Sequence, residues 1–455
     1  MDNPIYISPK KYFRKAAVDI VRQLVSNGYE AYIVGGAVRD LLLGDCPKDF
    51  DIATSATPEQ VRKVFSRHRC RIIGRRFRLA HVFCNGEIYE VSTFRREPTL
   101  EERHGLKPSD GIMIWNDNQY GTLQDDAKRR DFTVNALYCD VAKQGEIIDM
   151  TGGLADLHNR LVRCVGNPKR RFEEDPVRML RALKLCGLHH LRLEEQTQQA
   201  LRQTLPTIVK ASKARLFDEL MKVLFTINSE GIFAAFHDGG LLQYLLPGME
   251  AIWDTPNDNL MRQMLKMRDR CLAEDPEYFS SKSLALTVPV FPLIYSILVK
   301  DDVAPKAITR QMIDECDKAI HDFYQGHDIP HAFSTKILST CITLQSLLPP
   351  HRLNNHVINR EYYANAFELL RLFSMVSGKY AELLCKLPLP SEPPPEKEVA
   401  FISAQHEQPE GHGPNSVILP FDRVAEDLES PTSSRGELRR RSNRSKRHKR
   451  SPQTP

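Results

Sequence analysis

The spacing of hydrophobic and polar positions changes along the chain and predicts an α/β segment followed by a helical one. Residues 10–27 show helical spacing with Gly28 as a stop, so we expect an N-terminal helix. From residue 29 onward, short apolar runs bounded by glycine and asparagine are typical of strands and tight turns. After Phe172 the strand signals fade, and helical periodicity dominates to about residue 385.

The strand-rich segment divides into short elements. Thr57-Pro58-Glu59-Gln60 fits a capping box and predicts the start of a helix, and Asn85-Gly86 predicts a tight hairpin turn. Residues 96–120 are polar and aperiodic, so we expect a mobile loop there. The expected strands lie at 30–36, 48–54, 71–74, 79–84 and 87–95, with one more pair around Gly152-Gly153, and the expected helices at 37–44, 57–67 and 125–140.

Composition indicates the cellular compartment and shows where along the chain the excess of basic residues lies. Ten cysteines without a C-x-x-C pair, and the lack of an apolar leader or membrane-length run, predict free thiols in a soluble cytoplasmic protein without membrane contact. The net charge is +5, yet residues 435–450 hold nine of the 63 Lys/Arg and one of the 58 Asp/Glu. The rest of the chain therefore carries 54 basic and 57 acidic residues. Such a tail is typical of a disordered arm that binds polyanions, or of a merely solvated terminus.

Asp49-Phe50-Asp51 is the most informative motif, because two carboxylates two residues apart on a strand point to the same face. Like charges side by side are costly unless a cation lies between them, and oxygen ligands suit Mg²⁺. The Gly35-Gly36 pair just upstream precedes a short predicted helix, which suggests a phosphate site. Taken alone, a D-x-D pair is more often an ordinary surface feature.

A third carboxylate would complete such a site, and two candidates remain open. Glu90 follows the predicted hairpin on an apolar strand, where an acid needs a partner. Asp131, in Arg129-Arg130-Asp131, is the other candidate, although an N-cap or a surface ion pair explains it equally well.

Several arginines suit phosphate or base recognition, each with an ordinary alternative. Arg39 follows the glycine pair and could bind phosphate or lie on a solvated helix face. Residues 174–181 place Glu174, Asp175, Arg178 and Arg181 on one predicted helix face, as base-reading groups or as surface ion pairs. The run from Gly74 to Val82 combines basic residues with an aromatic, which suits RNA. No P-loop, G-x-G-x-x-G or G-x-S-x-G motif occurs.

Five motifs in order, GGAVRDLLLG, PKDFDIAT, EVSTFRR, KRRDFTVNALY and EEDPVRMLRALK, resemble the class II nucleotidyltransferases. This family contains bacterial poly(A) polymerases and CCA-adding tRNA nucleotidyltransferases. The resemblance implies an α+β fold, with a DNA-polymerase-beta-like head containing a mixed sheet, followed by an all-α neck and body. The implied parts are an N-terminal helix (1–28), the head (29–165), a base- and RNA-binding neck (166–235), an RNA-binding body (236–388), and a Pro-rich linker with a basic disordered tail (389–455).

The resemblance also implies residue roles. Asp49 and Asp51 would bind the catalytic metal, Mg²⁺ or Mn²⁺, and Asp131 would belong to the active site, while Glu90 stays a candidate acid from the strand pattern alone. The nucleotide-binding residues would be Gly35, Gly36, Arg39, Arg130, Asn135, Asp175 and Arg178, and the helix spacing adds Arg181 as a candidate. The expected RNA-binding residues are Arg75, Arg76, Arg78, Arg439, Arg440, Arg441, Arg444, Lys446 and Arg447.

Among the family's activities, the sequence favours template-independent poly(A) polymerase. GRRFRLAHV matches a G-[RK]-R-F-x-L-x-H-V signature of these polymerases, and the basic tail suits an enzyme that handles many RNA ends. The expected partners are RNA 3′ ends, ATP and RNA-degradation machinery. A CCA-adding enzyme is the nearest alternative, and a non-catalytic RNA-binding protein or a structural adaptor belongs to another class.

Overall fold

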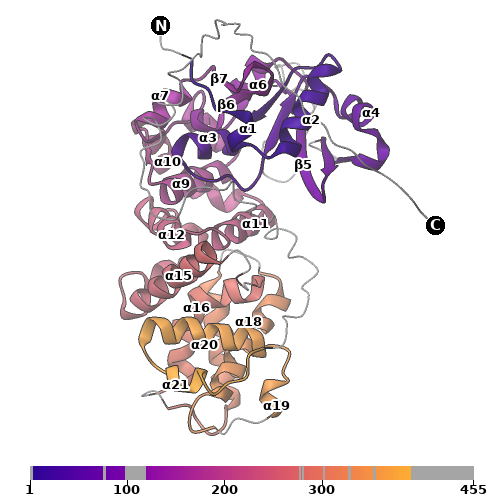
Figure 1. The fold of residues 1–455 in the computed structure, drawn as a ribbon. Helices are drawn as coiled ribbons and strands as arrows, with labels where there is room; N and C mark the ends of the chain where they lie inside the picture. Colours follow the sequence, from indigo (N-terminus) through magenta and orange to yellow (C-terminus); the bar gives the residue numbers. More distant parts are fainter. Residues whose placement is uncertain are drawn as a thin grey trace, which may run out of the picture.

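A seven-stranded mixed sheet lies at one end of the molecule, and helices extend away from it (Figure 1). The computed structural model describes residues 4–74, 78–97, 119–275, 278, 281–300, 303–325, 329–351 and 355–390. The strand order is β3-β4-β5-β2-β1-β6-β7. The strands are β1 (Ala31–Val34), β2 (Asp51–Thr54), β3 (Cys70–Ile73), β4 (Leu79–Cys84), β5 (Glu87–Thr93), β6 (Leu137–Asp140) and β7 (Glu146–Asp149).

The register of the sheet sets which side chains lie next to one another. β2 and β5 run parallel with Ile52 opposite Val91, whereas the other neighbouring strands are antiparallel. β1 lies between β2 and β6, and its Val34 is opposite Asp51. The start of β2 therefore lies in the middle of the sheet, where neighbouring strands can bring further side chains to it.

Helices cover the sheet and bury its apolar side chains. The head helices are α1 (Pro9–Tyr12), α2 (Lys15–Ser26), α3 (Gly36–Leu43), α4 (Pro58–Arg69), α6 (Leu123–Arg129) and α7 (Gly153–His158). α2 packs on β1 and β2, α3 on β1 and β6, and α4 on β3 and β4. Local signals explain several ends: Thr57 and Gln60 form the predicted capping box, and Gly44 ends α3 in the left-handed conformation.

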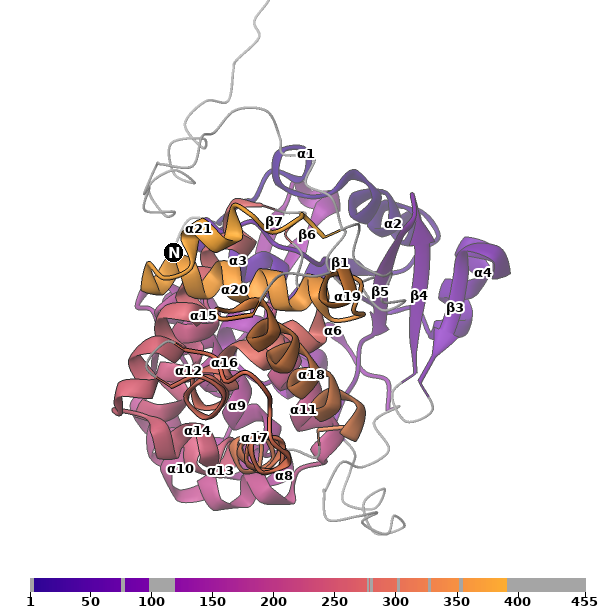
Figure 2. The same cartoon turned by 90° about the horizontal axis from the view of Figure 1, so that it is seen from below.

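In their described residues the neck and body are helical, apart from β9 (Arg192–Leu193), which pairs in parallel with β8 (Leu161–Val162) at the end of the head. Figure 1 shows the neck helices below the sheet and the body helices farther from it, and in Figure 2, seen from below, the body helices lie in front of the neck helices. None of the described helices is long and apolar enough to cross a membrane. The remaining helices are α8 (Pro168–Glu174), α9 (Val177–His189), α10 (Glu195–Thr204), α11 (Lys213–Leu224), α12 (Ser229–Asp238), α13 (Leu242–Leu245), α14 (Pro247–Ile252), α15 (Pro256–Glu274), α16 (Lys282–Leu298), α17 (Arg310–Phe323), α18 (His331–Leu347), α19 (Asn355–Ile358), α20 (Tyr363–Ser377) and α21 (Ala381–Leu384).

A close contact between α9 and α12 forms the centre of the neck. A Cβ on Gly187 would lie 2.5 Å from Ile232 Cα and 2.6 Å from Gly231 O, so the two helices approach this closely only with glycine at 187. One end of α9 is thus packed firmly against the next neck helix.

Four sequence predictions need correction. The expected helix at 10–27 is split, because Phe13 turns inward against Phe50 with ring centroids 5.9 Å apart. The expected helix at 125–140 ends at Arg129, and Leu137–Asp140 is the buried strand β6. Strands do lie on both sides of Gly152-Gly153, but they pair with β6 and with a later strand and not with each other, and Gly153 begins α7 between them.

The fourth correction concerns residues 174–181, which do not share one helix. α8 ends at Glu174, and Asp175 has extended backbone angles. Pro176 then precedes α9, as expected for a proline that disfavours helix in the preceding residue. Asp175 therefore lies at a break between two helices and not on a helical face with Arg178. The predicted mobile loop at 96–120 lies mainly outside the described residues.

Candidate active site

Two acidic side chains lie close together at the start of β2, in the middle of the sheet. Asp51 is the first residue of β2, and Asp49 lies just before the strand, with Phe50 buried between them. Because Ile52 is opposite Val91 in the parallel pair, Asp51 and Glu90 occupy neighbouring positions on adjacent strands. The structure thus brings Glu90 to the side of Asp51.

The surroundings of Asp51 hold an excess of negative charge. Its side chain reaches solvent, yet protein atoms surround it, and the loss of water together with Glu90 and Asp49 raises its pKa to about 6. Arg130 and Arg181 act in the opposite direction without cancelling this effect. The carboxylate therefore lacks sufficient positive charge in the protein itself.

This donor set fits a divalent cation chemically. Carboxylate oxygens are the ligands that Mg²⁺ and Mn²⁺ prefer, and the raised pKa of Asp51 is the response expected where a cation is needed. Within the described ranges, no three acidic, His or Cys side chains are already gathered closely enough to hold a metal ion. The residues that would hold it are Asp49, Asp51 and Glu90.

A glycine turn and a short helix lie beside these acids. Gly35 has φ +76°, which favours glycine, and a Cβ there would lie 3.4 Å from Arg130 Nη1. Arg39 is almost fully buried, and its Nη1 donates to Asn135 Oδ1 at 2.6 Å. Of the two alternatives for Arg39, the solvated helix face is therefore wrong. Gly36 begins α3 next to it.

Arg130 is held rigidly next to Gly35. Its Nε donates to the Tyr138 hydroxyl at 2.9 Å, and its Nη2 lies 3.1 Å from Asp126 Oδ2. Although burial acts the other way, Tyr138 and Asp126 raise the pKa of Arg130, so it stays charged. A fixed cation at a glycine turn is suited to binding a phosphate group.

Asp131 is engaged differently from Asp51. It is buried, accepts hydrogen bonds from the Phe132 amide at 2.8 Å and Asn135 Nδ2 at 3.2 Å, and lies 2.8 Å from Arg181 Nη2. Burial alone would raise its pKa, but Arg181 and these hydrogen bonds hold the pKa below its ordinary value. Asp131 is thus paired with a cation, although its Oδ2 makes no hydrogen bond within the described residues.

Sequence reasoning missed an arginine that contacts the break between α8 and α9 from another helix. Arg215, on α11, donates to both Asp175 carboxylate oxygens, at 3.0 and 2.9 Å. Arg178 is tied to α8, where its Nη1 donates to Arg171 O at 3.0 Å. Arg171 was also missed; it is buried and donates to Arg130 O at 2.6 Å. No local spacing signals either contact, because each joins residues far apart in the sequence.

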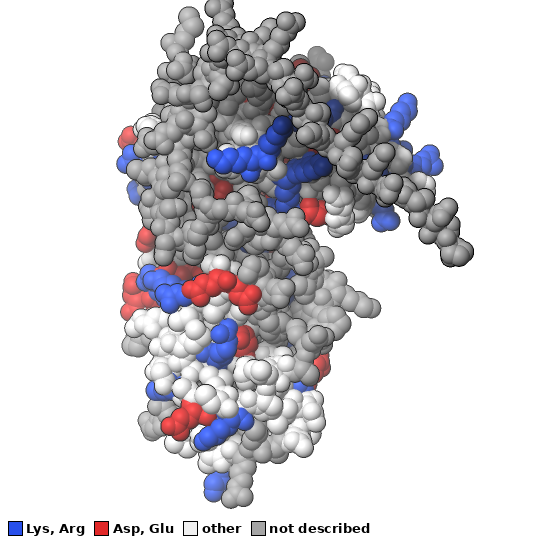
Figure 3. Space-filling view, in the orientation of Figure 1, with Lys and Arg blue, Asp and Glu red and all other residues white. Residues whose placement is uncertain are grey.

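The predicted RNA-binding residues are only partly described. Arg75, Arg76 and the tail positions 439–447 lie outside the described residues. Arg78 pairs with Glu59 on α4. On the face shown in Figure 3, Lys and Arg side chains gather on the head, and much of the lower body is uncharged.

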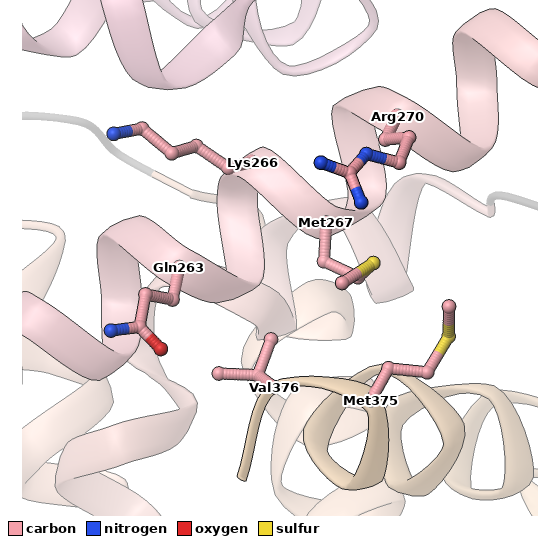
Figure 4. Close-up of a pocket in the computed structure, with 6 residues that line it drawn as sticks. All are labelled: Gln263, Lys266, Met267, Arg270, Met375 and Val376. Atoms are coloured by element: carbon pink, nitrogen blue, oxygen red, sulfur yellow. The ribbon is translucent and has the colours of Figure 1, made fainter.

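A separate groove of about 220 Å³ lies in the body between α15 and α20 (Figure 4). Lys266 and Arg270 border it, and Met267, Met375 and Val376 provide apolar side chains. Gln263 completes the lining, and Lys266 Nζ also lies 3.5 Å from Glu230 Oε1.

Known proteins resemble both segments of the chain. Residues 31–163 match the family description "Poly A polymerase head domain", and residues 190–252 match "Probable RNA and SrmB- binding site of polymerase A". Poly(A) polymerase I of Haemophilus influenzae is 41% identical over 260 residues, 57% of this chain and 57% of that enzyme. The CCA-adding enzyme of Enterococcus faecalis is 38% identical over 230 residues, 50% of this chain and 54% of that enzyme. These matches span little more than half of each relative.

A solved structure extends the likeness into the helices. The Bacillus stearothermophilus CCA-adding enzyme in complex with CTP has a TM-score of 0.58 and 26% identity, covering 82% of this chain and 81% of that one. The mixed sheet and the helices that follow have the DNA-polymerase-beta-like nucleotidyltransferase fold, as the sequence predicted. The chain thus resembles the tRNA nucleotidyltransferase/poly(A) polymerase family in its head and in the segment that follows.

Proposed function

We propose that this protein adds AMP from ATP to RNA 3′ ends without a template and releases pyrophosphate. The observation that supports the chemistry is the environment of Asp51, whose pKa is raised by burial and, to a smaller extent, by the negative charge of Glu90 and Asp49. A divalent cation held by Asp49, Asp51 and Glu90 would lower the pKa of the attacking hydroxyl and neutralise charge on the phosphates.

The chain's own side chains would position the nucleotide. Gly35 permits the close approach of a phosphate to the start of α3, while Arg130 and Arg39 supply positive charge there. Asn135 and Asp131 hold these groups through side-chain contacts. In-line attack then requires only that the RNA 3′ end reach the α-phosphate.

Base selection would fall to the neck. Asp175 and Arg178 lie at the α8–α9 break, and Arg215 fixes the Asp175 carboxylate in one plane. Planar donors and acceptors can pair with an adenine edge in place of a template base. RNA would bind mainly through its phosphates, with Lys266, Arg270 and the basic tail as contributors.

Two activities in the family compete for this assignment. Polyadenylation is supported by the GRRFRLAHV segment and by 41% identity to a poly(A) polymerase over 260 residues. CCA addition is supported by the likeness to a CCA-adding enzyme over 82% of the chain.

Separate nucleotides distinguish the two activities. We expect ATP alone to yield long A tracts on an unstructured RNA primer, with CTP giving little product, on a sequencing gel. Addition that requires tRNA lacking its 3′ end, uses CTP first and stops after a fixed length would instead establish a CCA-adding enzyme. No incorporation of any of the four nucleotides, with Mg²⁺ or Mn²⁺, would favour the non-catalytic RNA-binding alternative.

A further inference from the structure

Both ends of helix α9 contact the head through charged side chains. Near the start of the helix, Arg181 Nη2 lies 2.8 Å from Asp131 Oδ2. At its last residue, His189 Nδ1 lies 3.0 Å from Asp45 Oδ2, and His189 Nε2 lies 3.4 Å from Asp40 Oδ1. Asp40 is on α3 and Asp45 follows that helix, so α9 is tied to the head at two separate points.

These two points are joined inside the head. Asp131 Oδ1 accepts from Asn135 Nδ2 at 3.2 Å, and Asn135 Oδ1 accepts from Arg39 Nη1 at 2.6 Å. Arg39 Nε in turn donates to Asp40 Oδ1 at 2.8 Å. A continuous chain of polar contacts thus runs from one end of α9, through Arg39, to the other end.

His189 occupies the key position at the end of this chain. The side chain is buried, lies between two carboxylates, and ends a helix whose dipole favours positive charge. Its Nε2 makes no hydrogen bond within the described part of the chain, although it faces Asp40 Oδ1. That same oxygen accepts from Arg39, so any shift of Asp40 would reorient the guanidinium.

We propose that His189 is a positioning residue for nucleoside triphosphate binding, acting through Asp40 on Arg39. The proposal rests on the proposed function, because it assumes that Arg39 binds the phosphates. It couples two steps: α9 also carries Arg178 at the base-selecting end, so docking of α9 against the head aligns phosphate binding with base reading. The triphosphate is the part of the substrate that this contact serves.

The test compares ATP with AMP, which share a base and differ in phosphates. We expect His189→Ala in the full chain to weaken ATP binding about tenfold, or about 1.4 kcal/mol, because Asp40 loses the buried side chain that faces it and can then shift away from Arg39. AMP affinity should stay within about twofold, a change below about 0.5 kcal/mol. His189→Gln retains a donor and should restore part of the ATP affinity. Isothermal titration of each ligand measures these affinities.

A matched control and a second variant keep the test decisive. His237 forms a similar pair with Glu250, at 3.0 Å, between α12 and α14, so His237→Ala should leave both affinities unchanged. If His189→Ala does not fold, Asp45→Asn, at an exposed position, should still lower the ATP affinity relative to AMP. An unchanged ATP-to-AMP ratio in the folded His189 variant, or in Asp45→Asn where that variant fails to fold, overturns the positioning role. If the wild-type chain binds neither ATP nor CTP, the proposed function itself fails.

Discussion

Two regions of the head hold carboxylates in opposite electrostatic states. At the edge of β2 and β5, Asp51 stands beside Glu90 and Asp49, and its pKa is raised to about 6. In the turn after α6, Asp131 is paired with Arg181 and accepts two hydrogen bonds, and its pKa is lowered. Asp51 therefore lacks enough neighbouring positive charge to balance it, whereas Asp131 is balanced by Arg181.

The difference separates the acids that would act from the acid that supports them. Like charges held together oppose folding unless a ligand compensates them, whereas a carboxylate whose pKa is lowered by its partners stabilises the fold. Both acids lie in motifs that resemble the same family, so sequence alone left Glu90 and Asp131 as equal candidates. We therefore propose Glu90 as the third carboxylate and Asp131 as a support.

The largest expected effect comes from removing the unbalanced charge. Asp49→Asn with Asp51→Asn should lower AMP incorporation by about a thousandfold or more, the scale of losing electrostatic stabilisation in a transition state. Because the raised pKa of Asp51 shows that its charge opposes folding, the melting temperature without metal should stay the same or rise. Primer extension and thermal melting measure the two effects. Retained activity, or a clear drop in melting temperature, would contradict this account of the β2–β5 edge.

The next effect tests the other half of the comparison. Asp131→Asn should lower stability by about 1–3 kcal/mol at pH 7, because it removes a buried charge-assisted contact. A carboxylate with a lowered folded pKa stabilises above its unfolded pKa of about 3.9, and this contribution disappears as pH falls through the folded value. The stability difference from wild type should therefore shrink below about pH 4, as measured by urea unfolding across pH.

Glu90→Gln is the matched control for Asp131→Asn. Its side chain is exposed, so stability should change little, while turnover falls by about a hundredfold if it helps to hold the cation. The reverse result, a stable and inactive Asp131 variant with an active Glu90 variant, would exchange the two assignments.

Local signals allowed much of the head to be predicted from sequence. The capping box at Thr57, the hairpin at Asn85-Gly86 and the end of α3 at Gly44 each depend on a few consecutive residues, and all three are present. Strand β6 was missed because Leu137–Asp140 is buried throughout and shows no alternation of apolar and polar positions.

Contacts between distant residues could not be predicted in the same way. Arg181 with Asp131 and Arg215 with Asp175 join residues 50 and 40 positions apart. No periodicity within a helix records such a pairing, since it depends on how α9 and α11 pack. The partners that separate the proposed metal-binding acids from the supporting acid, such as Arg181 beside Asp131, are therefore found only in the folded structure.

The smallest expected effect concerns how Arg215 orients the proposed base-reading group. Arg215 binds both oxygens of Asp175, a geometry that lysine cannot reproduce with a single ammonium group. Arg215→Lys should keep the charge but free the carboxylate to rotate, lowering the preference for ATP over CTP by about tenfold, or about 1.4 kcal/mol. The ratio of kcat/KM for the two nucleotides measures the preference. Arg262→Lys is the matched control, because Arg262 on α15 pairs with Glu230 on α12 at 2.7 Å and should leave the ratio unchanged. Asp175 keeps one charged partner in the lysine variant. A changed ratio would therefore show that the planar orientation of the Asp175 carboxylate, and not charge alone, sets the nucleotide preference.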